Sequence, residues 1–252
     1  MTYLGLEKLR YKVSDGRCIV LPSTSLKATM LKTFPHTQAA LRIVTPGIAE
    51  VAGIASEALK RQARVALGLP VDGFCILLVG NDFRKKGLPA LLAALNRLPA
   101  DCYVAVVGNP EQTAFVEPDI ARLGLRERIF FLGAMVSVQP AYQAADCLAH
   151  PSLEDTFAMV VLEALACGLP VVVSSARYCG ISELLTDGEN ALLLDKPLDG
   201  ETLANLLERV RLDADVRTKL SGGALAFAAQ HLWSQQALRL DAIYRSVKTL
   251  GA

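Results

Sequence analysis

Two acidic residues, Asp155 and Glu163, lie eight positions apart in "DTFAMVVLEALACGLPVVVSS". Asp155 or Thr156 is a suitable N-cap, and Gly168 followed by Leu-Pro is a typical helix stop, which predicts a helix over 157–167. On one helix the two acids would be about 12 Å apart along the axis. A carboxylate accepts two hydrogen bonds, which suits the adjacent hydroxyls of a ribose. Glu163 would otherwise pair with a basic side chain or face solvent, but its neighbours are nearly all apolar, which favours a functional role.

A basic loop elsewhere in the chain has the composition of a phosphate site. In "GNDFRKKG", Arg84, Lys85 and Lys86 follow the apolar segment "FCILLV". The loop is not a P-loop, because six residues separate its glycines and Leu88 stands where that motif has a lysine. Such a run of charges is equally typical of a solvated loop, but its position directly after a buried strand favours phosphate binding. Free N–H groups at the start of the predicted 157–167 helix would favour an anion as well.

The composition of the 252-residue chain excludes several other classes of function. A formal net charge of +1 gives no electrostatic reason to expect a nucleic-acid partner. The longest apolar segment, 157–173, is interrupted by Glu163, Gly168 and Pro170, so it predicts no membrane span, and "MTYLGLEKLRYK" lacks the layout of a signal peptide. We therefore expect a soluble cytoplasmic protein, with peripheral contact at the inner membrane left open. Six cysteines without a CxxC pair and three widely spaced histidines predict neither a metal site nor a cofactor.

Alternating apolar and helical segments from residue 74 onward would position these residues. Six apolar runs predict buried parallel strands: "FCILLVG", "CYVAVVG", "RIFFLG", "DCLAHPS", "PVVVSS" and "ALLLD". The helical patterns between them are "GLPALLAALNRL", 111–123, 137–145, 158–167 and "ISELLTDG". This alternation predicts an α/β fold with a doubly wound, Rossmann-like parallel sheet that binds ligands at the carboxyl ends of its strands.

The two ends of the chain differ from this central part. "CIVLPSTSLKATMLKTF" and "LRIVTPG" predict one βαβ unit, which is too small to be a domain alone. The other predicted helices cover 56–67, 201–211, 213–230 and 234–247. We expect three units, namely 1–48, a ligand-binding domain over 49–230, and a C-terminal helix within 231–252.

The segment with the two acids resembles the motif of a known family. "LEDTFAMVVLEALACGLPVVVS" is similar to the donor-binding motif of retaining GT-B glycosyltransferases of family 4, the glycosyl transferases group 1. Three further segments match that family in the same order: "LLVGNDFRKKG", "RIFFLGAMVSVQPAYQAADCLAHPS" and "LWSQQALRLDAIYRSV". The resemblance covers most of residues 42–249 and is nearest to the bacterial lipopolysaccharide core glycosyltransferases.

The resemblance implies a role for each candidate residue. Glu163 would hold the ribose of the nucleotide, and Asp155 would contact the donor sugar. Asp155 and Lys86 would be the catalytic residues, with the lysine stabilising the departing diphosphate. Lys85 would join Lys86 at the phosphates, with Arg84 in reserve. The other substrate-binding groups would be the backbone of Phe157, Ala158, Met159 and Val160 at the sugar and diphosphate, and Gly108, Gly133 and Met135 at the base.

Two positions depart from the family pattern. The first acid is usually Glu, and here it is Asp155, with Glu154 beside it as a rival. The small residue next to the sugar is usually Gly, and here it is Ala158. We expect donor binding to persist, whereas the sugar is left open.

The resemblance also implies a second domain of which this sequence holds only a part. In the family one Rossmann-like domain binds the donor and another binds the acceptor, and residues 1–48 resemble only the end of the acceptor domain. "IVTPGIAE" would be the hinge, and 233–247 the helix that crosses back. A complete hexosyltransferase of this kind would transfer sugar from a nucleotide-diphospho-sugar, expected to be a UDP-sugar, to a glycan or glycolipid such as lipopolysaccharide core. We expect this chain alone to bind donor and to transfer poorly, with a partner chain or self-association covering the face of the missing domain.

Three alternatives remain open from sequence. A non-catalytic nucleotide-sugar-binding protein would work with a partner chain that supplies the other domain, and co-purification would reveal it. A related GT-B enzyme, such as an epimerase of UDP-sugars, would release nucleotide without an acceptor. A receiver-type signalling domain is disfavoured, because only Asp82 follows the first strand where such domains have an acidic cluster.

Overall fold

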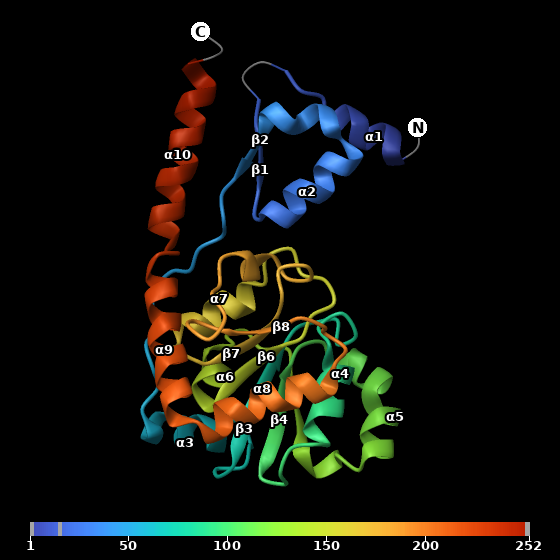
Figure 1. Ribbon diagram of the computed structural model, residues 1–252, viewed down its shortest axis with the longest axis vertical. Coiled ribbons are helices and arrows are strands. Elements are labelled where there is room, and N and C mark those ends of the chain that lie inside the picture. Colours follow the sequence, from blue (N-terminus) through green and yellow to red (C-terminus); the bar gives the residue numbers. More distant parts are fainter. Residues whose placement is uncertain (1–2, 15–16, 250–252) are drawn as a thin grey trace.

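The computed structural model describes residues 3–14 and 17–249, and a parallel sheet of six strands forms its centre (Figure 1). The expected terminal units therefore extend beyond the described residues at 1–2 and 250–252, and at 15–16 within the first unit. The strands of the sheet are β3 (Phe74–Val79), β4 (Cys102–Val107), β5 (Ile129–Gly133), β6 (Cys147–His150), β7 (Val171–Ser174) and β8 (Leu192–Leu194). Their order across the sheet is β5-β4-β3-β6-β7-β8, and every pairing is parallel. The predicted doubly wound α/β fold is confirmed.

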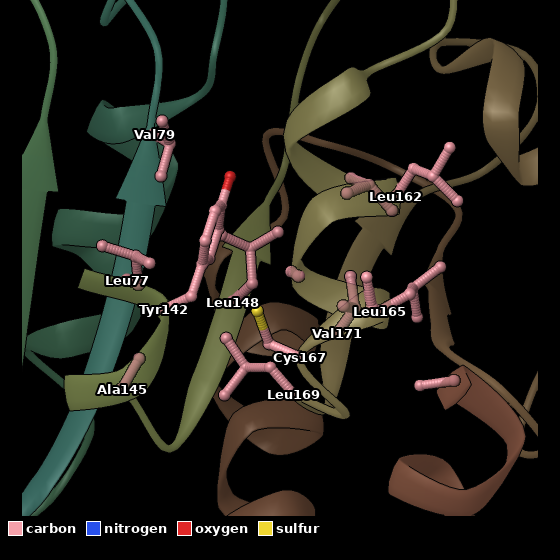
Figure 2. Packing of buried hydrophobic residues seen from close by; sticks show 14 of the residues in the cluster. Leu77, Val79, Tyr142, Ala145, Leu148, Leu162, Leu165, Cys167, Leu169 and Val171 are labelled. Atoms are coloured by element: carbon pink, nitrogen blue, oxygen red, sulfur yellow. The ribbon is translucent and has the colours of Figure 1, made fainter. Parts of the chain in front are cut away.

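Helices cover both faces of this sheet, and the strands β3 and β4 are buried at every position. Cys75, Leu77 and Val79 of β3 belong to one buried cluster, and Ile76 and Leu78 to the other. Against the first face pack α3 (Glu57–Ala66), α6 (Gln139–Ala144), α7 (Met159–Ala166) and α9 (Ala214–Ala229), and Figure 2 shows part of this core. Against the second face pack α4 (Leu88–Leu95), α5 (Thr113–Leu123) and α8 (Gly200–Leu212). Continuous apolar strands are the pattern expected of a sheet buried on both sides.

A smaller unit at the N-terminal end lies beside the last helix (Figure 1). It consists of α1 (Tyr3–Arg10), β1 (Ile19–Leu21), α2 (Thr24–Thr33) and β2 (Leu41–Ile43), and the two strands pair in parallel, as the βαβ prediction requires. The helix α10 (Trp233–Thr249) begins beside Ile48, in the segment that leads from this unit to the large sheet. There Ile48 exchanges backbone hydrogen bonds with His231 and Trp233 at 2.9 and 2.8 Å. Four short 3₁₀ turns complete the structure, at Pro35–Ala40, Pro110–Gln112, Arg126–Arg128 and Gly180–Glu183.

Two predicted helices were wrong in extent. The helix predicted over 157–167 begins only at Met159, because Ala158 has a left-handed backbone (φ +68°) that a right-handed helix cannot contain. The two acids are therefore not on one helix, and the separation estimated along a helix axis does not apply. "ISELLTDG" forms only the 3₁₀ turn Gly180–Glu183, because the Ile181 amide bonds to the Phe157 carbonyl and ties the segment to the preceding loop.

The strand order reverses between β3 and β6. One chain direction runs from β3 through β4 to β5, and the other from β6 through β7 to β8. In open α/β sheets the crevice at such a reversal, outside the carboxyl ends of the strands, is the usual place of a ligand. The basic loop follows β3, and the loop with Asp155 follows β6, so both predicted segments lie at this crevice.

None of the helices in the described part of the chain has the length and apolar character needed to cross a membrane.

Candidate functional site

A cavity of about 610 Å³ opens where β3 and β6 end. From the basic loop it is lined by Gly80, Lys85 and Lys86, and from the second loop by Glu154, Asp155 and the first residues of α7. The complete lining is Val79, Gly80, Asn81, Asp82, Lys85, Lys86, Glu154, Asp155, Thr156, Ala158, Met159 and Val160. The sheet therefore brings together two segments that are about 70 residues apart in sequence.

The basic loop is shaped by its glycines. Gly87 has φ +78°, and a Cβ there would collide with the carbonyl of Pro151, in the loop after β6. The two loops can approach each other this closely only with glycine at that position. The Lys86 side chain lies over Gly80, and a Cβ added at Gly80 would be only 2.5 Å from the Cγ of Lys86. This close contact directs the lysine toward the loop after β6.

The Asp155 carboxylate is the centre of the cavity's hydrogen bonds. Its Oδ2 accepts from Lys86 Nζ at 2.5 Å and from His150 Nε2 at 3.1 Å. Its Oδ1 accepts from the amides of Phe157 at 3.2 Å and Ala158 at 2.7 Å. The side chain of Asp155 is 13% exposed and that of Lys86 is 23% exposed, so the ion pair is partly shielded from water. Glu154, the rival acid, is 79% exposed and lies 3.7 Å from Lys85.

These contacts decide the charges in the site. Burial works to raise the pKa of Asp155, but hydrogen bonds from His150 and Lys86 outweigh it and hold the pKa well below its usual value. Burial lowers the pKa of His150 by more than its bond to Asp155 raises it, so the imidazole is neutral near pH 7. The His150 contact is therefore a hydrogen bond from a neutral donor, and Lys86 alone supplies the positive charge.

The first turn of α7 leaves two backbone donors free. Asp155 takes the amides of Phe157 and Ala158, whereas those of Met159 and Val160 have no acceptor within the described chain. Both of these residues line the cavity. Ala158, just before the helix, has φ +68°, a left-handed conformation that costs an L-residue about 1–2 kcal/mol and glycine far less. Free amides and the helix dipole together favour an anion at this point.

Glu163 faces a second cavity, of about 650 Å³, which adjoins the first at Met159. Tyr142 donates its hydroxyl to Glu163 Oε2 at 2.7 Å, and no ion pair to Glu163 occurs among the described residues. In Figure 2 the Tyr142 hydroxyl points toward the end of β3 that carries Val79. Burial, and next the Glu163 carboxylate, raises the pKa of Tyr142, which keeps it a donor. Glu163 Oε1 has no partner within the described chain, so this carboxylate has room for a ligand hydroxyl.

The structure gathers most, but not all, of the predicted site residues. Asp155, Lys86, Lys85, Ala158, Met159 and Val160 line the first cavity, and Glu163 lines the second. Arg84 lies with its guanidinium 5.9 Å from the Phe115 ring of α5 and lines neither cavity. Phe157 is buried and contributes its amide to Asp155. Gly108, Gly133 and Met135 also line neither cavity, and a Cβ at Gly108 would collide with the Gly80 carbonyl, which gives that glycine a packing role.

Two residues of the site were missed in the sequence. His150 was considered only as a zinc ligand, although a polar residue that ends a buried strand is the signal of a ligand edge. Tyr142 is three residues before the end of the helix predicted over 137–145, and nothing in its neighbours distinguishes it from an ordinary core aromatic. Among the described residues, no cluster of three histidine, cysteine or acidic side chains is placed to bind a metal ion.

A further cavity, of about 550 Å³, lies at the opposite edge of the sheet. Phe74 and Asp146 line it at the amino ends of β3 and β6, together with Lys60 of α3. Asp146 is already paired with Lys60 at 2.9 Å and with the buried Arg64 at 2.6 Å. The polar groups of this cavity thus hold α3 to the sheet. In addition, open α/β sheets bind ligands at the carboxyl edge of their strands and not at the amino edge.

Comparison with known proteins assigns a family to this arrangement. The model of the family described as Glycosyl transferases group 1 matches residues 60–225, which include both cavity-forming loops. The chain is 30% identical to a D-inositol 3-phosphate glycosyltransferase of Corynebacterium urealyticum, over 95% of this chain and 59% of that protein. It is 36% identical to D-inositol 3-phosphate glycosyltransferase 1 of Catenulispora acidiphila, over 73% and 47%. The chain spans about half the length of the curated relatives it matches.

Solved structures show the same fold. Anabaena Alr3699/HepE in complex with UDP-glucose has a TM-score of 0.83 at 24% identity, covering 95% of this chain and 67% of that one. WaaG, a glycosyltransferase involved in lipopolysaccharide biosynthesis, has a TM-score of 0.83 at 24% identity, with 96% and 66% covered. The C-terminal domain of the group 1 protein LpcC from Francisella tularensis has a TM-score of 0.63 at 21% identity, and 97% of it is covered by 73% of this chain.

Proposed function

The chain belongs to the glycosyl transferases group 1 family, and from this premise we propose that it binds a nucleoside diphosphate sugar across its two adjoining cavities. The observation that carries the proposal is the first turn of α7, where two residues with free amides line the same cavity as Lys86. In this arrangement the diphosphate lies between Lys86, Lys85 and the amides of Met159 and Val160. The ribose lies against Glu163 in the second cavity.

The donor would be a UDP-sugar, and its sugar would be transferred with retention of configuration at the anomeric carbon. Lys86 and the helix amides would stabilise the charge that develops on the departing diphosphate, an electrostatic role that the chain's own groups can fill. Asp155 would keep this constellation fixed. HepE, which has the same fold, was solved with UDP-glucose, which makes that compound the first donor to test.

The proposal includes two candidate classes of acceptor. The curated relatives are D-inositol 3-phosphate glycosyltransferases, which favours a phosphorylated polyol, whereas the likeness to WaaG concerns the fold. Lipopolysaccharide core is the second candidate. We propose the unit 1–48 as the end of an acceptor-binding domain, 49–230 as the donor domain and 231–252 as the helix that returns between them. Products formed from UDP-glucose with either acceptor, identified by mass spectrometry, distinguish the two.

Binding is tested by calorimetry of the chain with UDP-glucose, UDP, ADP and GDP. Glu163→Gln keeps an acceptor for the Tyr142 hydroxyl and removes the charge that would hold the ribose. We expect affinity for every bound nucleotide to fall about 10- to 100-fold, the worth of hydrogen bonds to a charged group. Glu201→Gln, at an exposed carboxylate of α8, is the control and should bind as the unaltered chain does. No binding of any nucleotide, or equal binding by both variants, refutes the proposal.

A further inference from the structure

His150 has no role in the function proposed above, yet it is the most buried polar side chain of the site. It ends β6, its side chain is 0% exposed, and its Nε2 lies 3.1 Å from Asp155 Oδ2. Its Nδ1 is buried and has no hydrogen-bond partner among the described residues. A buried polar atom without a partner carries a free-energy cost, so this histidine has a reason for its place other than packing.

The tautomer of His150 follows from its surroundings. The charged groups that act on the ring are Asp155 and Lys86, and the thiol of Cys179, which lies beside Asp155, is neutral because burial raises its pKa to about 12. A neutral imidazole carries one N–H, and the ionised Asp155 can only accept. The proton is therefore on Nε2, where it faces Asp155 Oδ2, and Nδ1 carries the bare lone pair.

The four hydrogen bonds to Asp155 respond differently when a nucleotide sugar binds. Three come from groups that are fixed in place: the His150 ring and the amides of Phe157 and Ala158. The fourth comes from Lys86, a flexible cation that also lines the cavity assigned to the diphosphate. A diphosphate carries more negative charge than one carboxylate and competes for this lysine. When Lys86 turns to the diphosphate, Asp155 loses the one cation that pairs with it among the described residues.

We propose that His150 is a positioning residue that holds Asp155 in place while Lys86 is shared between this carboxylate and the donor diphosphate. The proposal rests on the proposed function. Asp155 in turn fixes the amides of the loop before α7, so the effect of His150 reaches the donor through Asp155. Without His150, a carboxylate that has lost Lys86 keeps only two backbone donors and becomes easier to protonate.

Two variants at one position separate this role from packing. His150→Gln places an amide N–H near the position of Nε2 and restores the bond to Asp155. His150→Leu fills a similar volume and donates nothing. UDP-glucose is the probe, measured by calorimetry from about pH 3 to 8, because its diphosphate diester stays ionised in this range while Asp155 titrates at its acid end once donors are removed.

We expect His150→Leu to bind UDP-glucose about 10- to 100-fold more weakly than the unaltered chain. The pH below which it loses affinity should also be higher, since Asp155 has lost a donor that favours its charged form. His150→Gln should stay within about 3-fold of the unaltered chain, with an unchanged pH profile. Equal losses in both variants, or an unshifted pH profile in His150→Leu, overturn the positioning role.

A second measurement stands apart from donor binding. Nitrogen-15 NMR of labelled histidines in the unliganded chain, with His36→Gln to assign the exposed ring, should show His150 neutral and protonated at Nε2 near pH 7. In Asp155→Asn the Nε2 resonance should move. A proton on Nδ1, or a ring that Asp155→Asn leaves unchanged, refutes the His150–Asp155 pair. If this signature appears but the unaltered chain binds no nucleotide sugar, the proposed function fails, and with it the role of His150 toward the donor.

Discussion

Replacing Asp155 by Asn tests whether one carboxylate organises the site. The amide oxygen of Asn can still accept from Phe157 and Ala158, but its NH₂ group would face Lys86 and the Nε2–H of His150, so two bonds are lost. Hydrogen bonds to charged groups contribute about 1.5–3 kcal/mol each, and removing one partner of a shielded ion pair costs about 3–5 kcal/mol. We therefore expect Asp155→Asn to lower the free energy of unfolding by about 3–5 kcal/mol.

Thermal unfolding followed by circular dichroism measures this loss. For a chain of this size about 3–5 kcal/mol corresponds to a Tm about 6–20 °C lower. The matched control is Glu154→Gln, because Glu154 is the adjacent acid but is exposed and only weakly paired with Lys85. Its effect should remain within about 0.5 kcal/mol. A loss below about 1 kcal/mol in Asp155→Asn, or an equal loss in Glu154→Gln, would refute the assignment of Asp155 as the organising acid.

Three further outcomes are expected. Folding lowers the pKa of Asp155, so the stability it contributes is complete above the unfolded pKa of about 4 and is lost as pH falls through the folded value. Urea unfolding from about pH 5 to 2 should therefore show the difference in unfolding free energy between the unaltered chain and Asp155→Asn shrinking. A constant difference would argue against this role of Asp155. Gly87→Ala should cost about 1–3 kcal/mol more than Gly124→Ala, because both glycines are left-handed but only a Cβ at Gly87 meets backbone; equal midpoints in urea would contradict this. A thiol reagent at pH 8 should modify one cysteine quickly, the partly exposed Cys18, since burial raises the pKa of thiols such as Cys75 to about 12; fast labelling that persists in Cys18→Ser would show otherwise.

The sheet could be predicted from sequence because its strands are short apolar runs separated by helical patterns. That alternation leaves few arrangements, and it places the loops after β3 and β6 at one edge. Lys86 and Asp155 could be found from their place after those strands.

The details that failed depend on contacts between distant segments. The helix α7 begins later than predicted because Ala158 takes a left-handed conformation, directly after a residue, Phe157, whose carbonyl accepts from the distant Ile181 amide. Arg84 was expected as a reserve residue at the phosphates, but it lies over the Phe115 ring, whereas its neighbours Lys85 and Lys86 line the cavity. Periodicity does not carry such information, since it reports on burial and not on the direction of one polar side chain.

Amide chemical-shift mapping with UDP-glucose tests the central claim most directly. In a ¹⁵N-labelled chain, we predict that the largest shifts arise at Met159 and Val160, whose amides are free in the unliganded structure, with smaller shifts in the Gly80–Gly87 loop. Shifts that instead gather around Asp146 and Lys60, at the amino edge of the sheet, would place the ligand in the other cavity and contradict the account.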